Sequence, residues 1–389
     1  MKKSISRKDF IQQVGIMGAL ASLLPSNLLA GETAPQQVRV GIIGCGSVST
    51  QYLPHLSKSQ WVRLVSTCDI IEERAKAAAS KYSVPNYYTS IEKMLSGEPF
   101  DLLVNLTNMQ EHGKLNKLGL EHGRNIWSEK PMANSYQEGV TLMELAKKKQ
   151  LRIWGAPAVV MSPQFAYMSK VIQEGQLGTI AAAHGHYGHL GPTWSAFFYE
   201  KLGGSMPDLA VYNMATLTGL LGPVKSVVAM LNIITPTRKV DNRNSPIKVE
   251  AEDNSMVLME HASGALSHVQ SGFNYFDPYG HEGVGQEKPT VSIWGTKGNM
   301  HLIGYDWAPT GVDIATETHE KTRRVVMDTG HFVWQQGATA IAENMAKATD
   351  PMITTLHALH VLEIIEAARK SQETGTRIPL ESSFNWPLI

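Results

Sequence analysis

Short, mostly apolar runs alternate with amphipathic stretches through the first half of the chain. Residues 38–43 and 62–68 have the composition of strands that are buried on both faces, as in a parallel sheet. The alternation continues with predicted strands at 101–107, 125–128 and 151–154 and with predicted helices at 72–81, 111–122 and 136–148. This pattern indicates a doubly wound α/β domain over residues 36–157, which would bind ligands at the carboxyl ends of its strands.

A different pattern begins after residue 158. Runs of β-branched and apolar residues are separated by Gly, Asn and Asp turn signals, which predicts strands joined by tight turns. The predicted strands lie at 225–230, 254–259, 265–269 and 290–294. A chain of 389 residues is long enough to bury two cores, so we expect a second, α+β domain over residues 158–389.

The first thirty residues predict an export signal rather than a part of the fold. A basic head precedes an apolar core at 14–24, and small residues follow at 30–31. The apolar core is too short to span the ~30 Å of hydrocarbon in a membrane. Residues 6–11 are similar to the twin-arginine motif with Lys8 in place of the second arginine, so the general secretory route stays open. We expect residues 1–30 to be removed and the protein to be periplasmic.

Composition excludes several classes of protein. Lys and Arg total 35 against 35 Asp and Glu, so the basic surface of a nucleic-acid binder is not indicated. Two cysteines cannot hold a disulfide-rich scaffold together, and we expect Cys45 and Cys68 to be buried thiols. No metal site is expected, because no cluster of carboxylates accompanies His184, His186 and His189.

The first predicted strand is followed by GCGSVS, which matches the dinucleotide-binding fingerprint with a serine at its third small position. Gly44 permits a tight turn, Gly46 lets a pyrophosphate approach the backbone, and Ser49 keeps the next helix close to the sheet. Ser47 and Val48 lie at the start of that helix, whose N–H groups and positive dipole favour an anion. The turn therefore predicts a site for the phosphates of a dinucleotide.

Asp69 ends the second predicted strand, 23 residues after Gly46. A carboxylate at this place accepts hydrogen bonds from both hydroxyls of the adenosine ribose and repels a 2′-phosphate. NAD is therefore the expected cofactor and NADP the less favoured one. The alternative is a surface aspartate that caps the helix predicted at 72–81.

Glu129-Lys130-Pro131 follows the strand predicted at 125–128 and, with the glycine-rich turn and Asp69, resembles the Gfo/Idh/MocA oxidoreductase family. The resemblance extends over nearly the whole chain after residue 38, through segments 105–108, 203–212, 221–224, 295–298 and 360–374. It implies further cofactor contacts from Thr107, Asn108, His112, Glu129 and Lys130. It also implies that the second domain is a large, open, mostly antiparallel sheet, whose exposed face joins copies into a homo-oligomer.

The same resemblance implies that Lys130, Asp208 and Tyr212 are catalytic. A positively charged nicotinamide beside Lys130 favours the neutral amine, which can accept a hydroxyl proton. Asp208 and Tyr212 are four residues apart and are expected on one helix face, after Gly203-Gly204. A phenol is a poor base near neutral pH, so Tyr212 is expected to donate or to position. The alternatives are a solvated lysine at a strand end and an aspartate that complements a helix N-terminus.

Four further residues are candidates for contact with a substrate. They are His186, His189, Trp194 and Tyr275. The strand that carries the two histidines leads toward the Asp208 helix, and aromatic rings stack on the apolar faces of sugars. For each single aromatic residue, the alternative is a place in the core of the second domain.

These features predict an exported NAD(P)-dependent oxidoreductase that takes a hydride from a hydroxyl-bearing carbon of a saccharide or polyol. A ring hydroxyl of a glycoside, at carbon 3, is the preferred version. One alternative is a redox-neutral enzyme that keeps and recycles its cofactor, either a sugar–sugar oxidoreductase or an NAD-dependent glycosidase. The other alternative is a sugar or nucleotide sensor without turnover. A membrane anchor and a nucleic-acid partner are not expected.

Overall fold

The computed structural model describes residues 36–276, 287–326 and 332–389. The predicted export signal, residues 1–30, lies outside the described residues, and export stays a prediction. Within the described ranges, no helix combines the length and the apolar character that crossing a membrane requires.

In the described part of the chain, six parallel strands form the first sheet, in the order β3-β2-β1-β4-β5-β6. They are β1 (Val38–Ile43), β2 (Val62–Cys68), β3 (Asn86–Tyr88), β4 (Leu102–Asn105), β5 (Asn125–Ser128) and β6 (Ile153–Gly155). The predicted Rossmann sheet is thereby confirmed. The sequence analysis missed β3, because its three residues carry no apolar run.

Helices connect the strands of the first sheet. They are α2 (Ser49–Leu56), α3 (Glu72–Lys81), α4 (Ile91–Ser96), α5 (His112–Glu121) and α6 (Tyr136–Lys148), with a 3-10 turn at Met109–Glu111. Serine side chains determine where two of them begin. Ser90 accepts a hydrogen bond from a backbone N–H in the first turn of α4, and Ser135 does the same for α6.

The second sheet has nine strands among the described residues, in the order β16-β15-β14-β13-β7-β12-β11-β8-β17. They are β7 (Ile180–Gly188), β8 (Val224–Asn232), β11 (Asn254–His261), β12 (Leu266–Gly272), β13 (Pro289–Gly295), β14 (Gly298–Tyr305), β15 (Ala308–Thr316), β16 (His319–Val325) and β17 (Ile378–Pro379). β7 and β12 pair in parallel and their neighbours pair antiparallel, so the expected mostly antiparallel sheet is confirmed. A separate hairpin joins β9 (Thr237–Arg238) to β10 (Ile247–Lys248).

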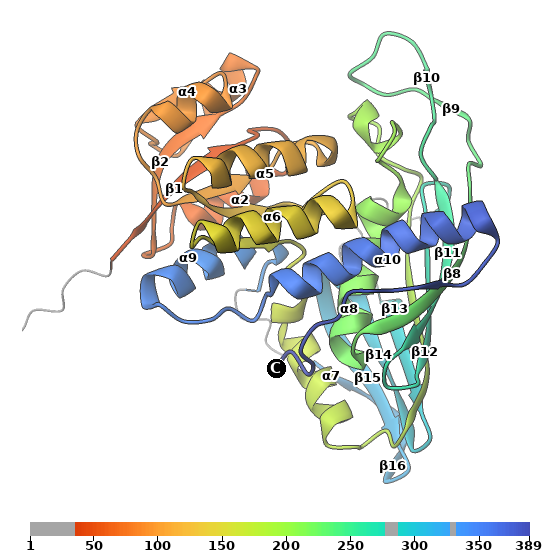
Figure 1. The fold of residues 1–389 in the computed structure, drawn as a ribbon. Coiled ribbons are helices and arrows are strands. Elements are labelled where there is room, and N and C mark those ends of the chain that lie inside the picture. The colour runs from red at the N-terminus through yellow and green to blue at the C-terminus, as the bar shows by residue number, and fades with distance from the viewer. Residues whose placement is uncertain (1–35, 277–286, 327–331) are drawn as a thin grey trace, which may run out of the picture. The chain divides into compact units, whose positions relative to one another are not determined.

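Helices pack on one face of the second sheet. Every residue of α8 (Val211–Leu221) is buried, and α10 (Thr355–Thr374) runs beside both α8 and β8 (Figure 1). The closing helix was predicted from residue 360, but Thr354 caps it and it begins at Thr355. The remaining helical segments are α7 (Pro163–Gln173) and α9 (Gly337–Lys347), with short turns at Val159–Met161, Ala196–Phe198, Met206–Ala210 and Trp334–Gln336.

The opposite face of the second sheet is exposed. Residues along β11 alternate between buried and exposed, as expected for a sheet that is covered on one side. The exposed face carries large apolar side chains, at Val228, Met230, Met256, Leu258, Leu266 and Trp294. Buried residues of both sheets, such as Val40 and Val257, belong to one core cluster, and the domain boundary near residue 157 stays a prediction.

Candidate active site

The glycine-rich turn joins β1 to α2 at the carboxyl edge of the first sheet. Gly44 has a φ of +88°, and a Cβ there would lie 2.6 Å from the backbone of Leu106, so this position requires glycine. A Cβ on Gly46 would meet no atom closer than Arg74 Nη1, at 4.0 Å. Space is therefore open directly above the backbone of Gly46, as the approach of a diphosphate requires.

The start of α2 lies beside that space. Val48 forms the N-cap without a side-chain hydrogen bond, so its side chain does not satisfy the first N–H groups of the helix. Ser47 precedes it, and Ser49 is buried and donates to the carbonyl oxygen of Gly46 at 2.6 Å. Open backbone and a helix N-terminus together suit the phosphates of a dinucleotide, so the residues present fit this cofactor.

Asp69 lies at the end of β2 with 8% of its surface exposed. Its Oδ2 accepts from the N–H of Cys45 and its Oδ1 from the N–H of Ile71, both at 2.8 Å. Asp69 is therefore not a surface residue, since its carboxylate is buried and ties β2 to the glycine-rich turn, but it does bind the N-cap residue of α3, as the alternative expected. Each oxygen keeps a further acceptor position for a ribose hydroxyl.

Cys45 and Cys68 lie at the same edge of the sheet. Both are buried and neither forms a disulfide, as predicted. Burial is the main cause that raises the pKa of each thiol to about 12. These cysteines therefore stay protonated and behave as small packing groups beside the dinucleotide turn.

The loop after β4 is held by His112 and Asn105. The ring nitrogens of His112 lie 2.7 Å from the carbonyl oxygen of Pro131 and 3.0 Å from that of Thr107. Burial lowers the pKa of this imidazole, and the two carbonyl partners oppose that shift. The ring nitrogens of His112 face protein carbonyls and fix the backbone on both sides of the site, and its predicted contact with the cofactor stays a prediction. Asn108, also predicted, is exposed at this edge.

Lys130 follows β5 and meets the second half of the chain. Its Nζ donates to the Oδ1 and to the backbone carbonyl of Asp208, each at 2.8 Å. The side chains of Lys130 and Asp208 are both 10% exposed, and the ammonium lies 5.2 Å from the ring centroid of Tyr212. The structure thus brings the three predicted catalytic residues together and excludes a solvated lysine.

Asp208 and Tyr212 do not lie on one regular helix. Asp208 belongs to a π-helical turn at Met206–Ala210, and the α-helix begins at Val211. This wider turn still directs both side chains to Lys130. Asp208 and Tyr212 were expected to meet because they share one face of an α-helix. They do lie together beside Lys130, but a π-helical turn brings them there.

Glu129 is a buried carboxylate behind Lys130. Its Oε1 accepts from the hydroxyl of Tyr52 at 2.7 Å, and its Oε2 accepts from the N–H of Lys130 at 3.0 Å. The indole of Trp127 donates to the same tyrosine hydroxyl at 3.3 Å. Both oxygens of Glu129 bind the protein, which fixes the backbone that carries Lys130, and its predicted contact with the cofactor stays a prediction.

Tyr212 packs against Trp334, which also packs against Tyr52, with ring centroids 6.1 Å apart in both pairs. Burial raises the pKa of Tyr212 well above its usual value, and the charge of Glu129 acts in the same direction. The phenol therefore stays protonated and can donate a hydrogen bond. The sequence analysis missed Tyr52 and Trp334, because no local pattern connects two rings that are so far apart in the chain.

Two of the predicted substrate residues lie on the wrong face of the second sheet. His186 stacks on Tyr275 with ring centroids 5.9 Å apart, and Tyr275 donates to Asn254 on the exposed face. α8 packs on the other face, against Gly185 of β7. His186 and Tyr275 therefore do not line the Lys130 site. Among the described residues, no group of three or more His, Cys, Asp or Glu side chains could hold a metal ion.

The other two candidates lie in the segment that follows β7. His189 is buried, accepts from the N–H of Gly191 at 2.9 Å, and lies edge-on to Tyr187. Trp194 is 38% exposed and packs against Phe198. The loop that they belong to also meets the first half of the chain, where Gln110 donates to the carbonyl oxygen of Phe197 at 2.8 Å.

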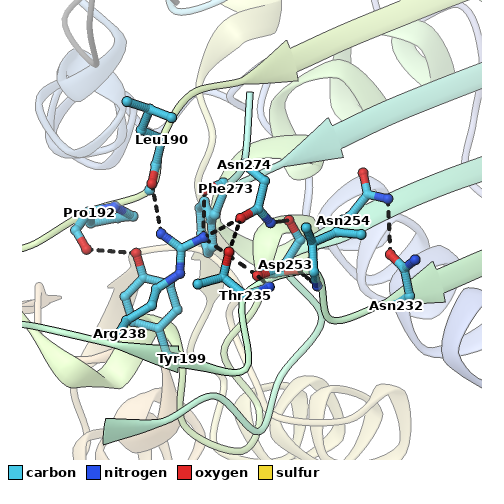
Figure 2. Close-up of polar contacts among 12 residues, drawn as sticks. Leu190, Pro192, Tyr199, Asn232, Thr235, Arg238, Asp253, Asn254, Phe273 and Asn274 are labelled. Atoms are coloured by element: carbon cyan, nitrogen blue, oxygen red, sulfur yellow. Dashed lines mark hydrogen bonds and ion pairs between the residues drawn. The ribbon is translucent and has the colours of Figure 1, made fainter. Parts of the chain in front are cut away.

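Arg238 holds this loop in place (Figure 2). Its guanidinium donates to the carbonyl oxygen of Leu190 and to that of Phe273, both at 2.7 Å, and it pairs with the fully buried Asp253 at 3.5 Å. It also lies over the ring of Tyr199, whose hydroxyl donates to the carbonyl oxygen of Pro192. One buried cation therefore fixes the backbone between His189 and Trp194, which the sequence pattern did not indicate.

Two family profiles match more than half of the chain. The profile described as "Oxidoreductase family, NAD-binding Rossmann fold" covers residues 38–156, and the profile described as "GFO/IDH/MocA C-terminal domain" covers residues 165–301. The chain belongs to the Gfo/Idh/MocA oxidoreductase family. The resemblance expected from Glu129-Lys130-Pro131 is thereby confirmed, and the protein is an NAD(P)-binding oxidoreductase.

Curated members of the Gfo/Idh/MocA family share little sequence with this chain. Trans-1,2-dihydrobenzene-1,2-diol dehydrogenase of Sus scrofa is 23% identical over 347 residues, which cover 86% of this chain and 96% of that protein. D-xylose dehydrogenase of Paenarthrobacter nicotinovorans is 23% identical over 199 residues, which cover 49% of this chain and 51% of that protein. Both proteins are named as dehydrogenases, for substrates of different chemistry.

Solved structures agree with the fold over most of the chain. Levoglucosan dehydrogenase, in complex with NADH and levoglucosan, has a TM-score of 0.77 at 18% identity and covers 89% of this chain and 100% of that one. GenD2 from gentamicin A biosynthesis, in complex with NAD, has a TM-score of 0.73 at 19% identity and covers 92% and 100%. At such identities the likeness establishes the Gfo/Idh/MocA fold, not the substrate.

Proposed function

We propose that this oxidoreductase oxidises a hydroxyl group of a saccharide, glycoside or polyol, with Lys130 as the base. The observation that carries the proposal is the bond between Lys130 Nζ and Asp208 Oδ1, at 2.8 Å and almost out of solvent. Lys130 of this pair lies at the carboxyl edge of the Rossmann sheet, the edge at which sheets of this type bind dinucleotides. A lysine within hydrogen-bond distance of a carboxylate has the geometry of a positioned acid–base group.

Lys130, Asp208 and Tyr212 would each have a separate role in the oxidation. When bound, NAD⁺ would supply the acceptor for a hydride from the carbinol carbon. After its ammonium has released a proton to solvent, Lys130 would take the hydroxyl proton, so that the alcohol becomes a carbonyl. Asp208 accepts from Lys130 and sets its direction, and protonated Tyr212 donates to the reacting oxygen. A ring hydroxyl at carbon 3 of a glycoside is our preferred substrate.

The relatives support the substrate class, since D-xylose dehydrogenase and levoglucosan dehydrogenase are named for sugars. A panel of sugars, glycosides and polyols incubated with protein and NAD⁺ tests the proposal. Net formation of NADH is the expected result. Product without net NADH would instead support a redox-neutral enzyme with a recycled cofactor, and binding without product would support a sensor.

We propose NAD rather than NADP as the cofactor. The support is Asp69, whose carboxylate ends β2 beside the glycine-rich turn and would repel a 2′-phosphate. Mass spectrometry of the cofactor released from denatured protein tests this directly. Recovery of NADP alone would contradict it.

We also propose that the protein is exported and forms a homo-oligomer. Export rests on the sequence of residues 1–30, and mature protein recovered from cells should begin near Gly31. Assembly rests on the exposed apolar side chains of the second sheet, among them Met230 (78% exposed) and Leu258 (56% exposed). Light scattering should give a mass above that of one chain, and Met230→Glu should lower it. A monomeric wild-type protein would contradict assembly.

A further inference from the structure

An aromatic cluster lies next to Tyr212 at one end of the second sheet. β7 and β14 point the same way, because each pairs antiparallel with β13 between them. Tyr187 near the end of β7 and Tyr305 at the end of β14 therefore meet, with ring centroids 4.4 Å apart. Tyr187 also lies 6.1 Å from the ring of Tyr212, so the cluster adjoins the site at Lys130.

The hydroxyl of Tyr187 is oriented by Trp307. The indole Nε1 of Trp307 donates to this hydroxyl at 3.1 Å, and the indole is itself stacked on Tyr305 with an interplanar angle of 12°. An indole N–H can only donate, so Tyr187 accepts here and keeps its own proton for another acceptor. Among the residues that the structure describes, no acceptor takes that proton. The hydroxyl of Tyr187 therefore makes one hydrogen bond as an acceptor and can make a second one as a donor to a ligand.

Tyr187 remains a donor over the whole physiological range. Burial raises its pKa well above the usual value of a phenol, and the nearby charges of Tyr305 and Asp208 act in the same direction. The ring of Tyr187 lies 6.1 Å from that of Tyr212, which in turn lies 5.2 Å from the ammonium of Lys130. A second protonated hydroxyl therefore stands near the reacting centre, in addition to that of Tyr212.

We propose that Tyr187 binds the substrate, by donating its hydroxyl proton to a second oxygen of the molecule that is oxidised at Lys130. The inference rests on the proposed function and names a residue that would recognise its substrate. The enzyme should select compounds with several oxygens, such as a sugar ring or a cyclic polyol, over alcohols with a single hydroxyl. Trp307 is a positioning residue for Tyr187, because it holds the hydroxyl in one orientation.

The experiment pairs Tyr187→Phe with a series of monodeoxy analogues of a substrate found in the sugar panel. In the wild-type enzyme, removal of one particular substrate oxygen should lower kcat/KM about 10-fold, the effect of one lost hydrogen bond with a buried partner. Tyr187→Phe should lose about the same factor on the full substrate and should no longer distinguish that deoxy analogue. Trp307→Phe should raise KM more than it lowers kcat, because Tyr187 keeps its proton and loses its orientation.

Tyr88→Phe is the matched control. Its hydroxyl also accepts from one N–H, that of Glu98 at 3.1 Å, but it lies in the first half of the chain. Tyr88→Phe should show the same losses of kcat/KM on the monodeoxy analogues as the wild type. Thermal unfolding shows whether each variant is folded. If folded Tyr187→Phe discriminates against every deoxy analogue as the wild type does, the inference is wrong while the proposed function stands. If no saccharide or polyol reduces NAD⁺ with the wild type, both are wrong.

Discussion

The ends of β5 and β7 differ in how their residues reach the site. β5 belongs to a parallel sheet, and Lys130 reaches Asp208 because the chain turns directly after this strand, with Glu129 behind it. β7 belongs to a sheet with one covered face, where neighbouring side chains point to opposite sides. Tyr187 therefore faces Tyr212, whereas His186 faces away from it. A sequence motif can therefore identify the functional residues that follow a strand. Along a strand with one covered face, the position of each side chain depends instead on which face its register turns toward the covering helices.

The largest effect should come from the end of β5. Lys130→Met should lower turnover by ~10²–10⁴, the usual contribution of a positioned acid–base group. The affinity for NAD should change little, because the turn at Gly44 and Asp69 hold the nucleotide. Single-turnover reduction of NAD⁺ by a confirmed substrate measures the effect. A rate equal to that of the wild type would show that Lys130 is structural.

The loop after β7 should depend on Arg238. Arg238→Met removes the cation beside fully buried Asp253 and should lower the free energy of unfolding by about 3 kcal/mol. KM should rise more than kcat falls, because the loop between His189 and Trp194 loses its anchor. Denaturant titration and steady-state kinetics test the two parts. Arg243→Met is the control, since its pair with Glu200 is exposed and is worth less than ~1 kcal/mol.

Acid should destabilise the packing of α10. Burial is the main cause that lowers the pKa of His357 to about 4 and that of His360 to about 3. Between these values and ~6.5 the unfolded chain binds more protons than the folded one, so stability is lost as the pH falls below ~6.5. Each ring should contribute up to about 1.4 kcal/mol per pH unit. Unfolding free energies measured from pH 7 to pH 5 test this, and His360→Gln should give a smaller slope.

The end of β2 should control the choice of cofactor. We expect NAD(H) to bind at least tenfold more tightly than NADP(H), a difference of ~1.4 kcal/mol. Asp69→Ala should narrow this gap, because the carboxylate that repels a 2′-phosphate is gone. Titration calorimetry with both dinucleotides measures it. Equal affinities in the wild type would remove the role given to Asp69.

The smallest effect should come from the exposed face of β7. His186→Ala should leave kcat/KM within about twofold of the wild type, because its ring stacks on Tyr275 behind the sheet. The neighbouring Tyr187→Phe makes the comparison direct, since the two positions are adjacent in the chain. A tenfold loss in His186→Ala would reverse the assignment of the two faces.

Local patterns predicted the first half of the chain well. The strand and turn around Gly44, the strand that ends in Asp69 and the meeting of Lys130 with Asp208 all agree with the structure. Each of these follows from a run of apolar residues, a turn or a family motif at a strand end.

What sequence analysis missed depends on contacts between distant segments. Trp307 binds Tyr187 across 120 positions of the chain, and Arg238 reaches Leu190 across 48. No periodicity encodes such pairs. The same limit explains why His186 was preferred to Tyr187, since alternation shows that neighbours differ in face but not which face is covered.

Trp334 gives the protein an optical reporter. Its indole stands between Tyr52, on the helix after the glycine-rich turn, and Tyr212, beside Lys130. Indole emission overlaps the absorption of reduced nicotinamide, so NADH that binds at this edge should quench Trp334 by energy transfer. The chain has 8 tryptophans, and Trp334→Phe would show which part of the signal comes from this one. Occupancy could then be followed by light alone, even in a variant such as Lys130→Met that does not turn over.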